Sequence, residues 1–187
     1  MVAESLEDED PAMLDTSRRM LLESAGKALN RLSFYRAAVG RGTTLGSGEA
    51  KGLIEKVLAE TKVSVKWEDS LSAQAGESAP ALLKIAINLG YMVGHAVHGG
   101  GTLTIRLSGS LAAPSISVSG SGQRLGFEES ARVALLAGAD ADLKAIAGLD
   151  PRAAQPYFTG RLAAVLGLKV SVPTISPATI EVVAARA

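Results

Sequence analysis

Residues 88–101 read NLGYMVGHAVHGGG, and this stretch decides the fold. It follows the apolar run LLKIAI (82–87) and precedes TLTIRLSG (102–109), in which apolar and polar residues alternate. The nearly continuous apolar character predicts a buried helix over 79–97, and the alternation predicts a half-buried strand over 101–109. Gly99, Gly100 and Gly101 would let the chain turn tightly between the two. The order of helix, glycine turn and strand indicates a mixed helix-and-sheet unit.

Composition narrows the classes of protein to consider. The chain has 187 residues, enough for a real core, and 47% of them are hydrophobic, which argues against a wholly disordered chain. The 19 basic and 19 acidic residues balance, so no overall positive field would recruit nucleic acid. The chain has no cysteine, which excludes disulfides, thiol nucleophiles and cysteine–zinc sites.

The chain shows no sequence signal for a membrane partner. None of its apolar runs reaches the ~18 residues that a transmembrane helix needs. The acidic start, MVAESLEDEDP, lacks the basic region of a signal peptide. We therefore expect a cytoplasmic protein.

A long helical arm is predicted at the start of the chain. Asp10-Pro11 is a typical helix start, and Gly40 and Gly42 would end the helix after Val39. Apolar or small residues recur at intervals of 7, 4, 3, 4, 3 and 4, a heptad stripe that needs partner helices along its length. The stripe consists of Leu14, Leu21, Ala25, Ala28, Leu32, Tyr35 and Val39. With residues 1–6 as the tail of a preceding helix, residues 1–42 would form a helical hairpin that dimerises into a four-helix bundle, with Leu14, Leu21, Ala25, Ala28 and Leu32 at the interface.

Residues 43–187 are predicted to form a second domain. We expect Gly138 and Gly167 to end the last two helices, and Asp150-Pro151 to start the second of them. Gathering the helices on one face of a sheet gives an α+β sandwich. The expected helices are 47–60, 79–97, 127–138 and 151–166, and the expected strands are 62–67, 101–109, 115–122, 168–173 and 179–186.

Three stretches in this order and spacing carry a resemblance to a known family. They are RLSFYRAAVGRG (31–42), NLGYMVGHAVHGGGTLTI (88–105) and QPYFTGRLAAVLGLKVSV (155–172). Together they resemble the ChpT-type histidine phosphotransferases of alphaproteobacteria. The resemblance implies a dimeric hairpin bundle followed by a Bergerat-like, degenerate histidine-kinase ATPase domain. It also implies a phosphorelay role: a bundle histidine takes a phosphoryl group from the receiver domain of a hybrid kinase and passes it to a CtrA-type response regulator.

The family's phosphoacceptor lies in a His-Asp pair on the first bundle helix, and the sequence has no such pair. The chain begins near the end of that helix, at VAESLEDED, so we expect the acceptor to be missing. Three explanations stay open: upstream residues left out, a misassigned start, or a paralogue that has lost the function.

Two requirements for an ATP site are unmet. When the glycine turn is lined up with that of a kinase of this fold, Asn88 takes the earlier polar position on the buried helix. Met92 then stands where the metal-ligating Asn should be, and a thioether is a poor ligand for Mg²⁺. In the stretch SGSGQR (119–124), Gly120 replaces the adenine-binding Asp and Arg124 replaces the last Gly. We therefore expect no ATP and no other cofactor.

His95 and His98 are the only histidines, and three-residue spacing would put them on one side of a helix. A zinc site needs about four ligands and no cysteine or acidic cluster is near, so we expect exposed residues at a helix end and no metal.

For partner binding the candidates are Arg36, Gln155 and Tyr157. Packing is the simpler role for Gln155 and Tyr157. For most basic residues of the arm, the simpler role is to form a solvated helix surface.

Three hypotheses follow: a phosphotransfer protein that binds receivers, a dimeric scaffold that binds receivers without passing phosphate, and, less favoured, an ATP-binding kinase. Phosphotransferase activity rests on the resemblance alone, and neither ATPase nor kinase activity is expected.

Overall fold

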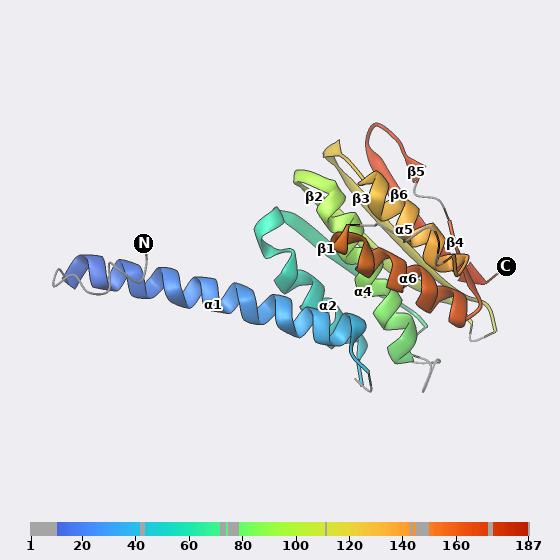
Figure 1. The fold of residues 1–187 in the computed structure, drawn as a ribbon, viewed down its shortest axis with the longest axis horizontal. Helices are drawn as coiled ribbons and strands as arrows, with labels where there is room; N and C mark the ends of the chain where they lie inside the picture. Colours follow the sequence, from blue (N-terminus) through green and yellow to red (C-terminus); the bar gives the residue numbers. More distant parts are fainter. Residues whose placement is uncertain are drawn as a thin grey trace.

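The computed structural model describes residues 11–41, 44–71, 74, 79–110, 112–142, 144, 150–171 and 174–186. Within them the class is α+β, as predicted (Figure 1). The helices are α1 (Pro11–Val39), α2 (Ser47–Val57), α4 (Ala79–Ala96), α5 (Glu129–Ala139) and α6 (Ala154–Val165), with short 3-10 turns η2 (Ala59–Thr61) and η5 (Pro151–Ala153). The strands are β1 (Val63–Asp69), β2 (Val97–Gly109), β3 (Pro114–Leu125), β4 (Leu168–Val170), β5 (Thr174–Ile175) and β6 (Thr179–Arg186).

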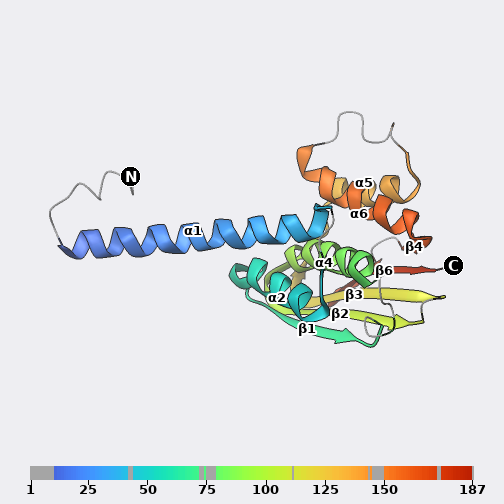
Figure 2. The same ribbon diagram turned by 90° about the horizontal axis from the view of Figure 1, so that it is seen from below.

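One sheet holds all the described strands. Its order is β1-β2-β3-β6-β4, with β5 paired to β6. β1 runs parallel to β2, and the other pairs are antiparallel. The helices α2, α4, α5 and α6 lie on one face, while α1 projects away from this unit (Figure 2). The strands alternate accordingly, and Leu103, Ile105 and Leu107 of β2 are fully buried on the helical face.

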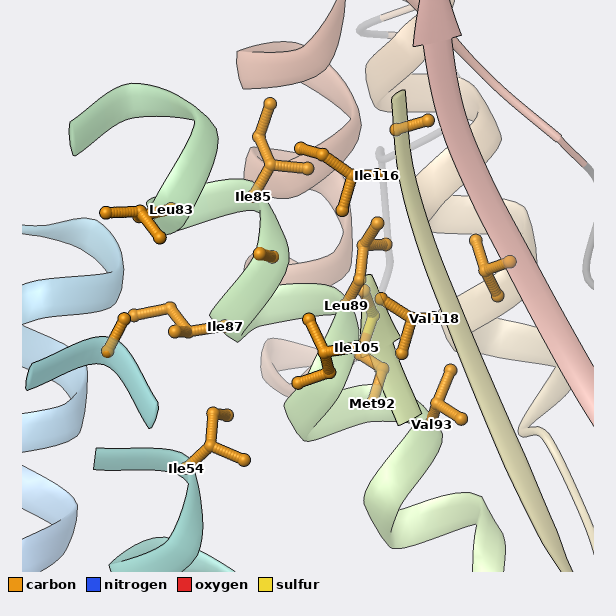
Figure 3. Close-up of a cluster of buried hydrophobic side chains, with 14 of the residues drawn as sticks. Ile54, Leu83, Ile85, Ile87, Leu89, Met92, Val93, Ile105, Ile116 and Val118 are labelled. Atoms are coloured by element: carbon orange, nitrogen blue, oxygen red, sulfur yellow. The ribbon is translucent and has the colours of Figure 1, made fainter. Parts of the chain in front are cut away.

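Helix α4 forms the centre of the core, as its apolar sequence predicted. Figure 3 shows Leu89, Met92 and Val93 of α4 among the side chains of the β2 and β3 strands. Glycines allow the close approach: a Cβ on Gly90 would lie 2.6 Å from Ile105 Cδ1, and one on Gly94 would lie 2.5 Å from Leu58 Cδ1. The helix therefore packs with its backbone near both the sheet and α2.

The glycine turn after α4 differs from the prediction. β2 begins at Val97, directly after α4, so Gly99, Gly100 and Gly101 lie inside the strand. They form a bulge, because the pairing with β3 shifts between His98 and Gly101. Gly99 and Gly100 have φ values of 83° and 102°, which favour glycine. The glycines thus shape the strand, and the chain reverses without a separate loop.

Two other helix ends were predicted wrongly. α2 ends at Val57 rather than Glu60, and η2 follows it. Gly138 lies within α5 and does not end it; a Cβ there would overlap the Tyr157 carbonyl oxygen of α6. A Cβ on Gly160 of α6 would likewise overlap the Leu135 carbonyl oxygen of α5. These two glycines let α5 and α6 pack backbone against backbone.

The start and end of the α6 segment agree with the prediction. The Asp150 carboxylate accepts a hydrogen bond from the Arg152 N–H at 2.8 Å, with Pro151 in the first position of η5. Gly167 follows α6 with a φ of 71°.

Helix α1 joins the domain through its last turns. Phe34, Ala37 and Ala38 are buried, and Phe34 stacks on Tyr91 of α4 with ring centroids 4.8 Å apart. By contrast, the predicted seam is exposed in this single chain, with Leu21 and Leu32 at 42% and 58%. The expected preceding helix, residues 1–6, lies outside the described residues, as does the Asp10 cap.

Asn88 joins three helices from a fully buried position. Its amide nitrogen donates to the Lys84 carbonyl within α4 at 2.8 Å and to the Ala38 carbonyl of α1 at 3.0 Å. Its amide oxygen accepts a hydrogen bond from Gln155 Nε2 of α6 at 2.9 Å. A buried carboxamide that is bonded on both sides fixes the arrangement of its neighbours.

We expect Gly160→Ala to lower the free energy of unfolding by about 1–3 kcal/mol, because the added methyl group overlaps the Leu135 carbonyl. Gly26→Ala is the matched control, since nothing lies within 4 Å of that position in α1 and alanine favours a helix. Urea unfolding measures both. Equal stability of Gly160→Ala and wild type would contradict the packing described for α5 and α6.

We expect Asn88→Ala to cost about 2–3 kcal/mol, because the buried Ala38 carbonyl and the Gln155 amide lose their partner. A double-mutant cycle with Gln155→Ala measures the link to α6. The two costs should be non-additive by about 0.5 kcal/mol or more. Additive costs would show that the bond to Gln155 contributes nothing to the junction.

Candidate functional site

A cavity of about 500 Å³ lies where α1, α4 and the segments that begin α5 and α6 meet. The end of α1 lies beside α4, next to the α5–α6 pair, in Figure 2. We call it the aromatic cavity. It is lined by Tyr35, Tyr91, Met92, His95, Ala96, His98, Gly126, Phe127, Glu128, Ala131, Arg152, Gln155 and Pro156.

A second, more open cavity of about 420 Å³ adjoins it, and we call it the basic cavity. It is lined by Glu60, Thr61, Lys62, His95, Val97, His98, Gly99 and Arg124. His95 and His98 belong to both walls. The site therefore has an aromatic part and a cationic part that share two imidazoles.

Two tyrosines form the wall between α1 and α4. The Tyr35 hydroxyl donates to the Tyr91 hydroxyl at 3.4 Å, and their ring centroids lie 6.2 Å apart. Burial raises the pKa of Tyr91 to about 12. Tyr91 is therefore a neutral hydroxyl at physiological pH.

The two histidines lie on different elements, which corrects the prediction of one helical face. His95 is on α4, and His98 is on β2 opposite Arg124. Both are exposed, as expected, although the His95 ring packs edge-on against Tyr91 at 4.4 Å. Partial burial, and then the charges of Arg31 and His98, lower the pKa of His95 and so favour its neutral form.

The positions compared with an ATP site have other contacts in the structure. The Asn88 side chain is hydrogen-bonded to Ala38, Lys84 and Gln155. The Met92 side chain, a thioether, lies on the wall of the aromatic cavity. A Cβ on Gly120 would lie 2.7 Å from a Val97 methyl and 3.0 Å from a Val93 methyl. An aspartate there would displace core side chains. Within the described ranges, no group of three His, Asp or Glu residues could hold a metal.

The predicted partner-binding residues fall at different places. Gln155 lines the aromatic cavity, half-buried and bonded to Asn88. Tyr157 is half-buried in α6, where its carbonyl faces Gly138, and it does not line the cavity. Arg36 is exposed in the last turn of α1, also outside the cavity lining. Their role in partner binding stays a prediction.

Sequence reasoning missed Tyr35, Tyr91, Glu128 and Arg152 as members of one site. Tyr35 counted only as part of the heptad stripe, and its partner Tyr91 lies 56 residues further along the chain. A pairing of that kind has no local sequence pattern.

Two basic residues of α1, Lys27 and Arg31, form exposed ion pairs. Lys27 contacts Glu23 and Glu60 at 2.7 and 2.6 Å, and Arg31 contacts Glu60 at 3.5 Å. Hydrogen bonds to the two glutamates raise the pKa of Lys27, and the bond from Lys27 lowers the pKa of Glu60. Such pairs are a solvated surface feature and contribute little to stability.

None of the helices in the described part of the chain is both long enough and apolar enough to cross a membrane.

Comparisons with known proteins place this geometry in context. The model of the histidine phosphotransferase C-terminal domain matches residues 47–175. A solved bacterial phosphotransferase is similar over 98% of this chain and 84% of its own, with 26% identity and a TM-score of 0.74. A comparison with curated proteins gives no match.

Histidine kinases share the fold. The blue-light activated histidine kinase of Erythrobacter litoralis EL346 covers 94% of this chain and 49% of its own, with 14% identity and a TM-score of 0.54. The kinase domain of that protein covers 99% of this chain and 92% of its own, with 13% identity and a TM-score of 0.51. These likenesses concern the fold alone. The family match spans most of the chain, and the protein therefore belongs to the histidine phosphotransferase family.

Proposed function

We propose that this chain is a ChpT-type phosphorelay protein that passes a phosphoryl group between the receiver domain of a hybrid kinase and that of a response regulator of the CtrA type. The observation that carries the proposal is the family match over residues 47–175, with similarity to a bacterial phosphotransferase along nearly the whole chain. In each step an imidazole nitrogen and a receiver carboxylate exchange the phosphoryl group: one P–N or P–O bond forms as the other breaks. No ATP is consumed in this exchange.

Neither histidine of the chain suits the acceptor role. An acceptor must be exposed on a bundle helix beside a carboxylate that orients its ring. His95 packs against Tyr91 at the end of α4, and His98 lies in the sheet. We therefore assign the acceptor to the first helix of the bundle, as the family resemblance implies, and expect no stable phosphohistidine at His95 or His98.

The exposed surface of α1 supports a dimeric four-helix bundle. Besides the predicted seam, Leu22 and Leu29 are 66% and 62% exposed. They follow Leu21 and Ala28 by one residue each, which places them about 100° around the helix. A helix with two adjacent apolar faces suits a bundle, in which each helix contacts two neighbours. One neighbour would be the preceding hairpin helix, and the other would come from the second copy of the chain.

Receiver docking would use the junction of this arm with the Bergerat-like domain. Arg36 lies at the end of α1 where its charge is exposed. A receiver presents an acidic pocket around its phosphorylated aspartate, so an exposed guanidinium would steer it toward the arm. Gln155 and Tyr157 would form the rim on α6. A cytoplasmic location fits these partners.

A scaffold that binds receivers without passing phosphate is the alternative, because the described surface offers docking groups and neither histidine fits the acceptor role. An ATP-binding kinase is less favoured, since Met92 and Gly120 do not meet the chemistry of such a site.

We expect Arg36→Glu to weaken binding of a receiver domain phosphorylated with acetyl phosphate by about tenfold, through lost charge complementarity. Lys66→Glu is the control, since Lys66 is exposed on β1, on the sheet face away from the helices. Isothermal titration calorimetry measures both. Equal loss in the two variants would mean that net charge matters and the site does not.

A chain extended by the first bundle helix should gain a labelled phosphohistidine when it is mixed with a labelled phosphorylated receiver domain. An extended chain that stays unlabelled would favour the scaffold.

We expect Leu21→Asp and Leu32→Asp each to shift the chain toward the monomer, because a carboxylate buried in the seam has no partner there. Ser64→Asp on the exposed face of β1 serves as control. Light scattering during size-exclusion chromatography gives the mass. Unchanged masses for both seam variants would exclude the bundle through this face.

A further inference from the structure

The basic cavity lies at the end of α4, on the side of η2 and the edge strand β1. Its lining comes from η2, the residue before β1, the last turn of α4, the start of β2 and the end of β3, and no described residue of α5 or α6 takes part. We infer that this cavity binds an inorganic phosphate chain of the pyrophosphate type, an anion with charge at both ends and no organic group. The inference does not rest on the phosphotransfer role.

Two cations of the cavity lack an anionic partner. Lys62 and Arg124 are exposed, and neither forms an ion pair within the part of the chain that the structure describes. Like charges that share a cavity repel each other, so an anion between them relieves this repulsion and forms charge-assisted hydrogen bonds with both.

The sheet topology places these two cations on opposite sides of β2. Lys62 directly precedes β1, which pairs with β2 from Gly101 onward, and Arg124 lies on β3 opposite His98. Neighbouring strands lie about 4.8 Å apart, so two strand spacings separate the Cα atoms of Lys62 and Arg124 by roughly 10 Å. A chain with a charged group at each end can meet both side chains, whereas a single phosphate group would have to draw them together.

The main chain of β2 is open between the two charges. Gly99 lies in the β2 bulge, and no residue on either neighbouring strand is in register with it. Its φ is 83°, and nothing lies within 4 Å of the place where its Cβ would stand. Ligand oxygens can therefore approach the backbone at this point, next to the His98 imidazole.

Negative groups beside the cavity are already engaged. The Glu60 carboxylate in the lining contacts Lys27 of α1 at 2.6 Å and Arg31 at 3.5 Å. The Ala96 carbonyl at the end of α4 accepts a hydrogen bond from the Gly126 N–H at 2.9 Å. The two cations of the lining therefore remain as positive charge that these groups do not offset.

The lining favours a plain anion over an organic ligand. Sites for organic ligands are lined mainly by apolar and aromatic side chains. Val97 is apolar here, and the described lining holds no aromatic ring besides the two imidazoles. The volume of about 420 Å³ leaves room for more than one phosphate group.

The test is calorimetric titration of the chain with sodium pyrophosphate, orthophosphate and AMP in a metal-free buffer of low ionic strength. Pyrophosphate should bind in the submillimolar range and about tenfold more tightly than orthophosphate, because only the longer anion reaches both cations. AMP should bind no more tightly than orthophosphate. No binding of pyrophosphate, equal binding of orthophosphate, or tighter binding of AMP than of pyrophosphate would overturn the inference.

Variants locate the site. Arg124→Gln and Lys62→Gln should each weaken pyrophosphate binding about tenfold, because each removes one charge-assisted bond. Lys66→Gln is the matched control: it removes the same charge from an exposed position on the sheet face away from the helices, and its affinity should stay within about twofold of wild type. Undiminished binding in either cavity variant, or an equal loss in the control, would reject this site.

A protection experiment on the wild-type chain needs no substitution. Saturating pyrophosphate should slow the acetylation of Lys62 by an amine-reactive reagent severalfold, since the bound anion covers its ammonium group. Lys66 should react at an unchanged rate, and peptide mass spectrometry follows both. Equal rates for Lys62 with and without pyrophosphate would contradict the proposed site.

Discussion

The buried carboxamide of Asn88 is the interaction on which the arrangement of the helices depends. It lies in the middle of α4, and its two polar atoms reach the last turn of α1 and the first turn of α6. A buried amide costs free energy unless both its nitrogen and its oxygen are bonded, so the bonds to all three helices favour this placement of them. Phe34 and Tyr91 stack beside it and add an apolar contact to the same junction. The arm, the sheet-bearing domain and the α5–α6 pair thus meet around one residue.

The same constraint affects the two positions where the sequence lacks the polar groups of an ATP site. The Asn88 side chain is held by hydrogen bonds to α1, α4 and α6, so turning its oxygen toward a metal ion would break the bond from Gln155, and one turn later Met92 offers only sulfur. Gly120 leaves no room for a carboxylate, because Val93 and Val97 fill the space next to it. The cavity that results is aromatic and cationic, and its chemistry differs from that of a metal–triphosphate site.

Much of the fold could be read from local patterns. The alternation of β1 to β3, the apolar run of α4 and the Asp150-Pro151 start each depend on neighbours in sequence, and each agrees with the structure. The errors arose where a glycine serves a distant contact. Gly138 is read as a helix end when only its neighbours are considered, but its lack of a side chain is needed for the Tyr157 carbonyl of α6. The glycines after Val97 are read as a turn, although pairing with β3 makes them a bulge.

The sequence by itself determined the α+β class, the long α1 and the buried α4, because hydrophobic periodicity and helix-start signals act within a few residues. It also showed that Met92 carries a thioether and that Gly120 carries no carboxylate, since those are properties of the residues themselves. Only the tertiary structure decided that Tyr35 meets Tyr91, that Gln155 bonds Asn88, and that His95 and His98 share two cavities. These contacts join residues from separate elements. Their distances depend on how whole helices pack on the sheet, and no local pattern encodes that.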